Sequence, residues 1–158
     1  MPGIRTVMAV LCLATLCGPS AARSSQSEPT VFGIWIEPEL QAEVVVFACG
    51  EAICGELIRL PEGAPRTDVN NPDPALRGRP LVGLRVLRDF RPSGPGLWEG
   101  GGDQGLRPGR LYVPANGDTL GDAENTYVIR LNSRDTLSIG IKDCVLTCVL
   151  NSIWTRAE

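Results

Sequence analysis

The stretch Asp68–Leu81, DVNNPDPALRGRPL, holds the densest set of side chains that could do chemistry. Its carboxylate and amide oxygens are ligands of the kind that calcium prefers. An EF-hand loop beginning at Asp68 would nevertheless put Asp73 at the glycine position and Arg79 at the position of the bidentate glutamate. The pattern therefore excludes an EF-hand and leaves only an irregular calcium site open, and we predict no metal site.

The same carboxylates raise the question of catalysis. Asp68 and Asp73 could form an acid–base or glycosidase-type pair. The chain contains no histidine, and its cysteines are expected to be bridged, so the usual nucleophile–base pairs are not available. Loop carboxylates are more often helix caps or ion-pair partners. We predict no catalytic residue and no cofactor, with a carboxylate-dependent enzyme as the less favoured alternative.

A structural role explains more of these residues. Asp73 is a good N-cap and Pro74 a good first helical residue, while Gly78 and Pro80 would end the turn. One short helical turn is therefore expected within the loop 61–81. We predict a fixed connection that packs over one end of the domain, with a lid or a partner-binding surface as the alternative.

The polar residues around that turn have structural partners within reach. Asn71 precedes a proline and must stay extended, and its side chain can close an Asx-turn. Arg77 and Arg79 can pair with Asp68 and Asp73, although exposed pairs contribute only about 0 to 1 kcal/mol.

The elements that would position this loop are strands. Alternation of apolar and polar residues with a period of two, bounded by Gly, Pro, Asn and Asp, dominates the chain. A short ninth strand near Trp98 would add to eight predicted strands. The eight are Val31–Ile36, Ala42–Ala48, Ile53–Leu60, Val82–Phe90, Arg110–Val113, Thr126–Asn132, Thr136–Lys142 and Asn151–Arg156.

Three of these strands have one clean apolar face, and nothing in the chain reads as a long amphipathic helix that could cover it. A sheet with one dry face must then close on itself. We predict an all-β fold, an up-and-down antiparallel barrel of about eight strands. Its interior would hold one small ligand or pack as a dry core. The predicted lining is Val82, Leu84, Val86, Tyr127, Ile129, Leu131, Leu137, Ile139 and Ile141.

One segment between the predicted strands is expected to be a loop. Residues 92–109, PSGPGLWEGGGDQGLRPG, are so rich in glycine and proline that a long flexible loop is predicted.

The N-terminus predicts export. Residues 1–22 combine a short basic start, an apolar run of about twelve residues and a small-residue end, which is typical of a secretory signal peptide and too short to span a bilayer. A flexible segment 23–30 and a single domain 31–158 would follow. We expect a periplasmic or secreted protein without a transmembrane segment.

Charge argues against a nucleic-acid partner. Residues 1–22 contain one arginine and no acid, so their removal changes the formal charge from −3 to −4. Without a basic stripe, binding to nucleic acid is not expected.

Four cysteines remain after the signal peptide, an even number for an oxidising compartment. Of three connectivities, the local pairs Cys49–Cys54 and Cys144–Cys148 are favoured because each flanks a short turn-like insert. The alternative is zinc binding by a C-x4-C and C-x3-C set, whose spacings are not the usual ones.

An ordered set of short motifs resembles a known family. The motifs are Gly33-Ile34-Trp35, Cys49-Gly50, Cys54-Gly55, Asp68, Asn70-Asn71-Pro72-Asp73-Pro74, Leu76-Arg77, Arg79-Pro80-Leu81, Gly83 and Trp154-Thr155-Arg156. Together they resemble the bacterial secreted family called domain of unknown function 2147, over about residues 31–157. The resemblance implies a lipocalin-like barrel whose biochemical role is unsettled across the family.

The resemblance extends to the calycin pattern, G-x-W in the first strand with an arginine in the last. It implies that Trp35, two residues after Gly33, crosses the barrel floor and that Arg156 lies over its ring. Such a cation–π contact is worth about 0.5 to 2 kcal/mol and would close one end of the barrel.

These observations together predict an exported, non-enzymatic barrel that binds a small apolar or amphipathic ligand. The alternative is an interaction module for an envelope protein, with the loops 61–81 and 92–109 as the contact surface.

Overall fold

The computed structural model describes residues 29–101, 110–120, 126–142 and 152–158. The predicted signal peptide 1–22 and most of the segment 23–30 lie outside these residues. Within them, no helix has the length and apolar character needed to cross a membrane.

The described chain is built from ten strands and one 3₁₀ turn. They are β1 (Gly33–Glu37), β2 (Ala42–Cys49), β3 (Ala52–Arg59), η1 (Pro74–Leu76), β4 (Arg85–Gly94), β5 (Leu97–Gly101), β6 (Arg110–Val113), β7 (Asp118–Leu120), β8 (Thr126–Leu131), β9 (Thr136–Ile141) and β10 (Ser152–Arg156).

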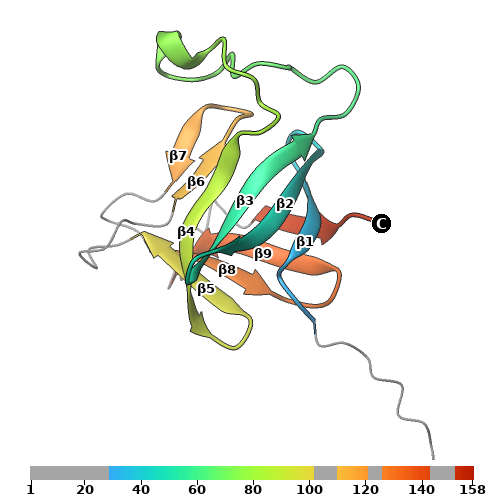
Figure 1. The fold of residues 1–158 in the computed structure, drawn as a ribbon, viewed down its shortest axis with the longest axis vertical. Helices are drawn as coiled ribbons and strands as arrows, with labels where there is room; N and C mark the ends of the chain where they lie inside the picture. The colour runs from blue at the N-terminus through green and yellow to red at the C-terminus, as the bar shows by residue number, and fades with distance from the viewer. Residues whose placement is uncertain (1–28, 102–109, 121–125, 143–151) are drawn as a thin grey trace, which may run out of the picture.

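Eight of the strands close into a ring. The order β3-β2-β1-β10-β9-β8-β5-β4 ends where β4 pairs again with β3, and all of these pairs are antiparallel. The β6–β7 hairpin extends from the first half of β4, while the second half of β4 pairs with β5 (Figure 1). The predicted all-β antiparallel barrel of eight strands with one short helical turn is confirmed.

Two strand assignments differ from the prediction. The strand Arg110–Val113 is predicted in the ring, but as β6 it lies beside the ring with β7. Its place is taken by β5, the short strand around Trp98. The predicted flexible loop 92–109 is therefore wrong for residues 92–101, which form the β4–β5 hairpin. Glycine and proline obscure the strand because backbone pairing with β4 and β8, and not side-chain alternation, defines it. Residues 102–109 lie outside the described chain.

The start of the fourth strand is also later than predicted. Gly83 has φ +86°, a left-handed conformation that breaks the extended chain. β4 begins only at Arg85, and Val82 is 49% exposed instead of lining the interior. Val82, Leu84 and Val86 therefore alternate in the sequence without lying on one face of a strand, because a turn at Gly83 separates Val82 from β4.

One end of the barrel, here called the base, lies where Arg156 covers Trp35. Trp35 belongs to the buried core together with Leu87, Phe90, Ile129 and Leu137. At this end the guanidinium carbon of Arg156 lies 4.1 Å from the centre of the Trp35 ring, the arrangement that the calycin pattern implies.

Hydrogen bonds hold Arg156 in that position. Its guanidinium donates to the backbone carbonyls of Thr30 (2.6 Å), Phe32 (3.1 Å) and Arg134 (2.5 Å). Gly33 makes room for it, because a Cβ at this residue would lie 2.6 Å from a guanidinium nitrogen. The arginine thus ties the entry of β1 to the β8–β9 turn and closes the base.

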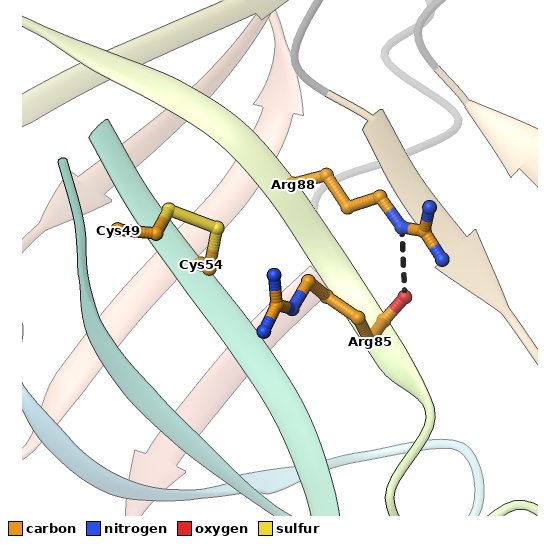
Figure 2. Close-up of a disulfide and its surroundings, with 4 residues drawn as sticks. All are labelled: Cys49, Cys54, Arg85 and Arg88. Carbon is orange, nitrogen blue, oxygen red and sulfur yellow. Dashed lines mark hydrogen bonds between the residues drawn. A yellow bond between two sulfur atoms is a disulfide. The ribbon is translucent and has the colours of Figure 1, made fainter. Parts of the chain in front are cut away.

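A disulfide joins Cys49 and Cys54 across the β2–β3 hairpin (Figure 2). This is the local pairing that the spacing favours. It links the end of β2 to the start of β3. The second predicted pair, Cys144 and Cys148, lies outside the described residues.

Candidate functional site

The other end of the barrel, here called the mouth, contains an apolar pocket. It lies between the β1–β2 turn, the start of β4, β8 and β10, and the ends of β3, β6 and β9. The pocket is lined by Glu37, Glu39, Leu40, Ala42, Val44, Leu57, Val86, Leu111, Tyr112, Val113, Pro114, Tyr127, Ile139, Gly140, Ser152 and Trp154.

The free space in this mouth pocket is small, about 40 Å³. A water needs roughly 10 to 15 Å³ by the same measure, so the space equals only a few waters. Drug-sized ligands occupy pockets of about 300 to 1,000 Å³. The barrel as it stands therefore has no room for a lipid-sized ligand, and most of its interior is packed core.

Polar groups are few in the mouth pocket, and one of them, the carboxyl group of Glu37, has a shifted pKa. The carboxylate of Glu37 accepts hydrogen bonds from the backbone amides of Glu39 (2.7 Å) and Leu40 (2.9 Å), which fold the β1–β2 turn. Burial nevertheless raises the pKa of Glu37, and the two amides oppose that rise only in part. A partly buried carboxyl group thus stands at the edge of an apolar space.

The structure distributes the predicted lining residues over three environments. Val86, Tyr127 and Ile139 line the mouth pocket. Ile129 and Leu137 are buried in the core below it. Leu84, Leu131 and Ile141 are partly buried against that core, and Val82 is exposed.

The polar stretch 68–81 forms a closed network above the mouth. The Asp68 carboxylate is fully buried. Its Oδ2 accepts from Asn71 Nδ2 (2.8 Å) and from Arg79 Nε (2.8 Å), with Arg79 Nη2 at 2.7 Å. Its Oδ1 accepts from the Tyr112 hydroxyl at 2.5 Å. Every oxygen of this carboxylate is engaged by the protein.

The network also fixes the backbone of the loop. Asn71 Oδ1 accepts from the amide of Asp73 (2.9 Å), which is the predicted Asx-turn, and Arg77 Nε donates to the carbonyl of Asn71 (2.8 Å). Asp73 caps the 3₁₀ turn by accepting from the amide of Ala75 (2.9 Å). These bonds within residues 71–77 agree with the predicted fixed connection over the loop 61–81.

The loop is attached to the β6–β7 hairpin as well as to itself. Asn70 Nδ2 donates to the carbonyl of Ala115 at 2.7 Å, and the Arg79 guanidinium lies 5.2 Å from the centre of the Tyr112 ring. Burial and the hydrogen bond to the Asp68 carboxylate raise the pKa of Tyr112, so the phenol remains a donor. The hairpin outside the ring therefore supports the loop.

This geometry gives the two loop carboxylates separate structural tasks. Asp68 is surrounded by three donors, whereas Asp73 binds a backbone amide on the exposed side of the turn. A general acid–base pair needs two carboxyl groups that face one reacting position. Asp68 and Asp73 do not form such a pair.

The described residues contain one group with the geometry for a metal. The ligand atoms of Cys49, Cys54 and Asp89 lie within 4.8 Å of one another. Both sulfur atoms are joined in the disulfide, and the thiolate, not the disulfide, is the form that binds metal. In this oxidised state the group is a disulfide beside a carboxylate.

Sequence reasoning misses two members of the site. Tyr112 lies 44 residues from Asp68 along the chain, and only the position of the β6–β7 hairpin brings them together. Glu37 is missed because, in the sequence, it looks like an ordinary acidic residue before a turn. The Tyr112-Val113-Pro114 stretch gives a partial signal, because a tyrosine before a turn is well placed to reach a neighbouring loop.

Comparison with known proteins agrees with the architecture. Residues 33–156 match the model of a family described as "Uncharacterized protein conserved in bacteria (DUF2147)". The match covers most of the chain, so the chain belongs to this family. No curated protein matches the chain.

A solved structure is similar in fold. It is described as "Protein HP1028 from the human pathogen Helicobacter pylori belongs to the lipocalin family". The TM-score is 0.61 at 20% identity, and the alignment covers 82% of this chain and 84% of that chain. The likeness concerns the fold, a lipocalin-like barrel.

Proposed function

We propose that this member of the DUF2147 family is an exported binding protein that takes a small apolar or amphipathic ligand at the mouth of its barrel. The observation that supports the proposal is the apolar pocket at the mouth, opposite the sealed base. Barrels of this size hold a small ligand or none. The predicted signal peptide supports a periplasmic or secreted location.

The size of the pocket restricts the ligand. With about 40 Å³ free, the mouth can accept a short apolar group, such as a chain of a few carbons, but not a whole lipid. The Glu37 carboxyl group at the edge offers a hydrogen bond to a polar end. A short amphipathic molecule, or the tip of a longer one, fits both features.

The test is binding of a series of carboxylic acids and alcohols with four to twelve carbons, followed by tryptophan fluorescence, because Trp154 lines the pocket. Binding should reach its maximum at short chain lengths. Ala42→Leu fills the pocket and should abolish binding, whereas the matched control Val82→Leu adds a methylene on the exposed loop and should not. Equal binding by both variants would remove the mouth pocket as the site.

A second function has its own supporting observation. Three apolar side chains are exposed on this loop or directly after it: Val69 (51%), Leu76 (39%) and Val82 (49%). Exposed apolar side chains that form one patch are typical of a contact surface. Native mass spectrometry of the protein purified from its host distinguishes the two functions. A small added mass favours the pocket, and an added protein that Val82→Asp removes favours the loop.

A further inference from the structure

We infer that a groove along β4 and β6, which adjoins the proposed mouth pocket at Val86 and Tyr112, binds a phosphate-type anion. The groove has a volume of about 230 Å³. Four arginines line it, together with Pro72 and Leu76 of the loop: Arg79, Arg85, Arg88 and Arg110.

The strand register places two like charges side by side. Arg88 of β4 is the direct partner of Arg110 of β6, next to the pair Leu87 and Leu111. Both leucines are buried, so alternation turns both arginines to the outer face. Directly opposite residues have Cβ atoms only about 5 Å apart, and like charges there are destabilising. An anion bound between them would attract both guanidinium groups and offset their repulsion.

Neither arginine has an acidic partner in the described parts of the chain. The ion pairs found there are Arg59–Glu43, Arg79–Asp68, Arg91–Glu51 and Lys142–Glu99. Arg88 Nε donates to the carbonyl of Arg85 at 3.3 Å, which orients the guanidinium without neutralising it (Figure 2). Its terminal nitrogens remain able to donate to a ligand.

Arg85 also lines the groove, but its side chain is directed differently from that of Arg88. In Figure 2 its side chain turns toward the disulfide, whereas that of Arg88 extends away from it. The Arg85 guanidinium lies over the ring of Phe47, 5.4 Å from its centre. Arg88 and Arg110 therefore supply the two charges that face each other across the β4–β6 pair, and Arg85 adds a third beside them.

Arg79 contributes donors in a fixed position. Its charge is balanced by Asp68, and Asp68 engages only its Nε and Nη2. The side chain is held between the carboxylate and the Tyr112 ring. A planar guanidinium fork suits the oxygens of phosphate better than an ammonium does. The facing charges of Arg88 and Arg110 and the oriented fork of Arg79 match a dianion with several oxygens.

The apolar residues of the groove suggest what the phosphate carries. Pro72, Leu76 and Leu84 give the groove an apolar side, which inorganic phosphate would not use. The shared chemistry is a phosphate group, either free or esterified to an apolar residue. A short-chain phosphatidic acid and inorganic phosphate therefore serve as the two probes.

The experiment is isothermal titration calorimetry of the whole protein with inorganic phosphate and with dihexanoyl phosphatidic acid below its micelle concentration. Ionic strength is matched with chloride. Arg88→Gln and Arg110→Gln should each weaken binding by about tenfold. The control Arg130→Gln removes one exposed arginine from β8 and should change affinity by less than about twofold. Arg88→Lys keeps the charge but loses the fork, so its loss should be intermediate.

The outcomes separate clearly. Tighter binding of phosphatidic acid identifies an esterified ligand, and equal binding identifies free phosphate. Without phosphate at low salt, Arg88→Gln should be at least as stable as the wild type because the repulsion is relieved. Absence of binding by both probes, or equal weakening in Arg130→Gln, would overturn the inference.

Discussion

At the scale of single residues, Asp68 shows how a polar loop becomes part of a core. The carboxylate is fully buried and accepts from three side chains. Its nearness to Arg79 could be predicted from the sequence, because the two lie on either side of a short turn. Tyr112 could not be predicted, since its position depends on a hairpin that pairs with β4.

Removing the charge of Asp68 should therefore loosen the whole loop. Asp68→Asn leaves Arg79 without its counter-ion and places an amide among donors, so we expect a loss of about 3 kcal/mol in the free energy of unfolding. The control Asp73→Ala removes only the cap of the 3₁₀ turn and should cost about 1 kcal/mol. Urea denaturation measures both. Equal losses would mean that the buried network adds nothing beyond a cap.

Gly33 allows a test of the sealed base. Its φ is +130°, and a Cβ added there would lie only 2.6 Å from a guanidinium nitrogen of Arg156, so the position has no room for a side chain. Gly33→Ala should cost more than about 2 kcal/mol, combining backbone strain with displacement of Arg156. The control Gly63→Ala has φ +84° but open space around it, so it should cost only about 1 kcal/mol. Thermal unfolding should show the smaller shift for Gly63→Ala.

Burial of Glu37 predicts a dependence of stability on pH. Because its pKa is raised in the folded protein, the folded state binds this proton more tightly than the unfolded chain does. The contribution of Glu37 is then fully present below the ordinary pKa and is lost as pH rises through the raised pKa. Relative to Glu37→Gln, the wild type should lose stability as pH rises above about 4.5. A difference that does not vary between pH 3 and pH 7, roughly the carboxyl range, would contradict this.

At the scale of elements, regular alternation is a reliable guide and composition is not. The strands β2, β8 and β9 agree with their predicted ranges to within one or two residues. The β4–β5 hairpin is hidden by glycine and proline, and the start of β4 by a left-handed Gly83. Both errors arise where backbone conformation, and not the side-chain pattern, decides the structure.

The disulfide across the β2–β3 hairpin can be tested by removing both of its cysteines. In Cys49→Ala/Cys54→Ala, the loop of a few residues is no longer closed, and the chain-entropy model gives a loss of about 2 kcal/mol. Urea denaturation without reductant measures it, so that Cys144 and Cys148 stay in their original state in both proteins. An unchanged unfolding midpoint would show that the hairpin hydrogen bonds alone fix β2 and β3.

At the scale of the whole molecule, closure of the ring is what distinguishes base from mouth. Apolar strand faces and the calycin pattern are enough to predict the barrel and its sealed end. They cannot predict how much interior remains, because the free volume depends on which large side chains fill it. Trp154 and Phe90 occupy space that the same pattern would allow to be empty. The ligand-binding proposal is limited to the mouth for that reason.

Because the ring is closed, a substitution that weakens one pair of strands should lower the stability of all the strands. Arg156 connects three backbone carbonyls and covers Trp35, at the point where β1 pairs with β10. Arg156→Met should lower the free energy of unfolding by about 2 to 4 kcal/mol, from the lost cation–π contact and hydrogen bonds.

Amide hydrogen exchange shows how far that loss spreads. In a closed barrel that unfolds as one unit, the most protected amides of β2, β3, β8 and β9 should exchange faster by the same factor as those of β1 and β10. The control Arg130→Met, on the outer face of β8, should leave protection unchanged. Faster exchange confined to β1 and β10 would mean that the arginine is a local latch, because the remaining strands would then keep their stability without the β1–β10 pair.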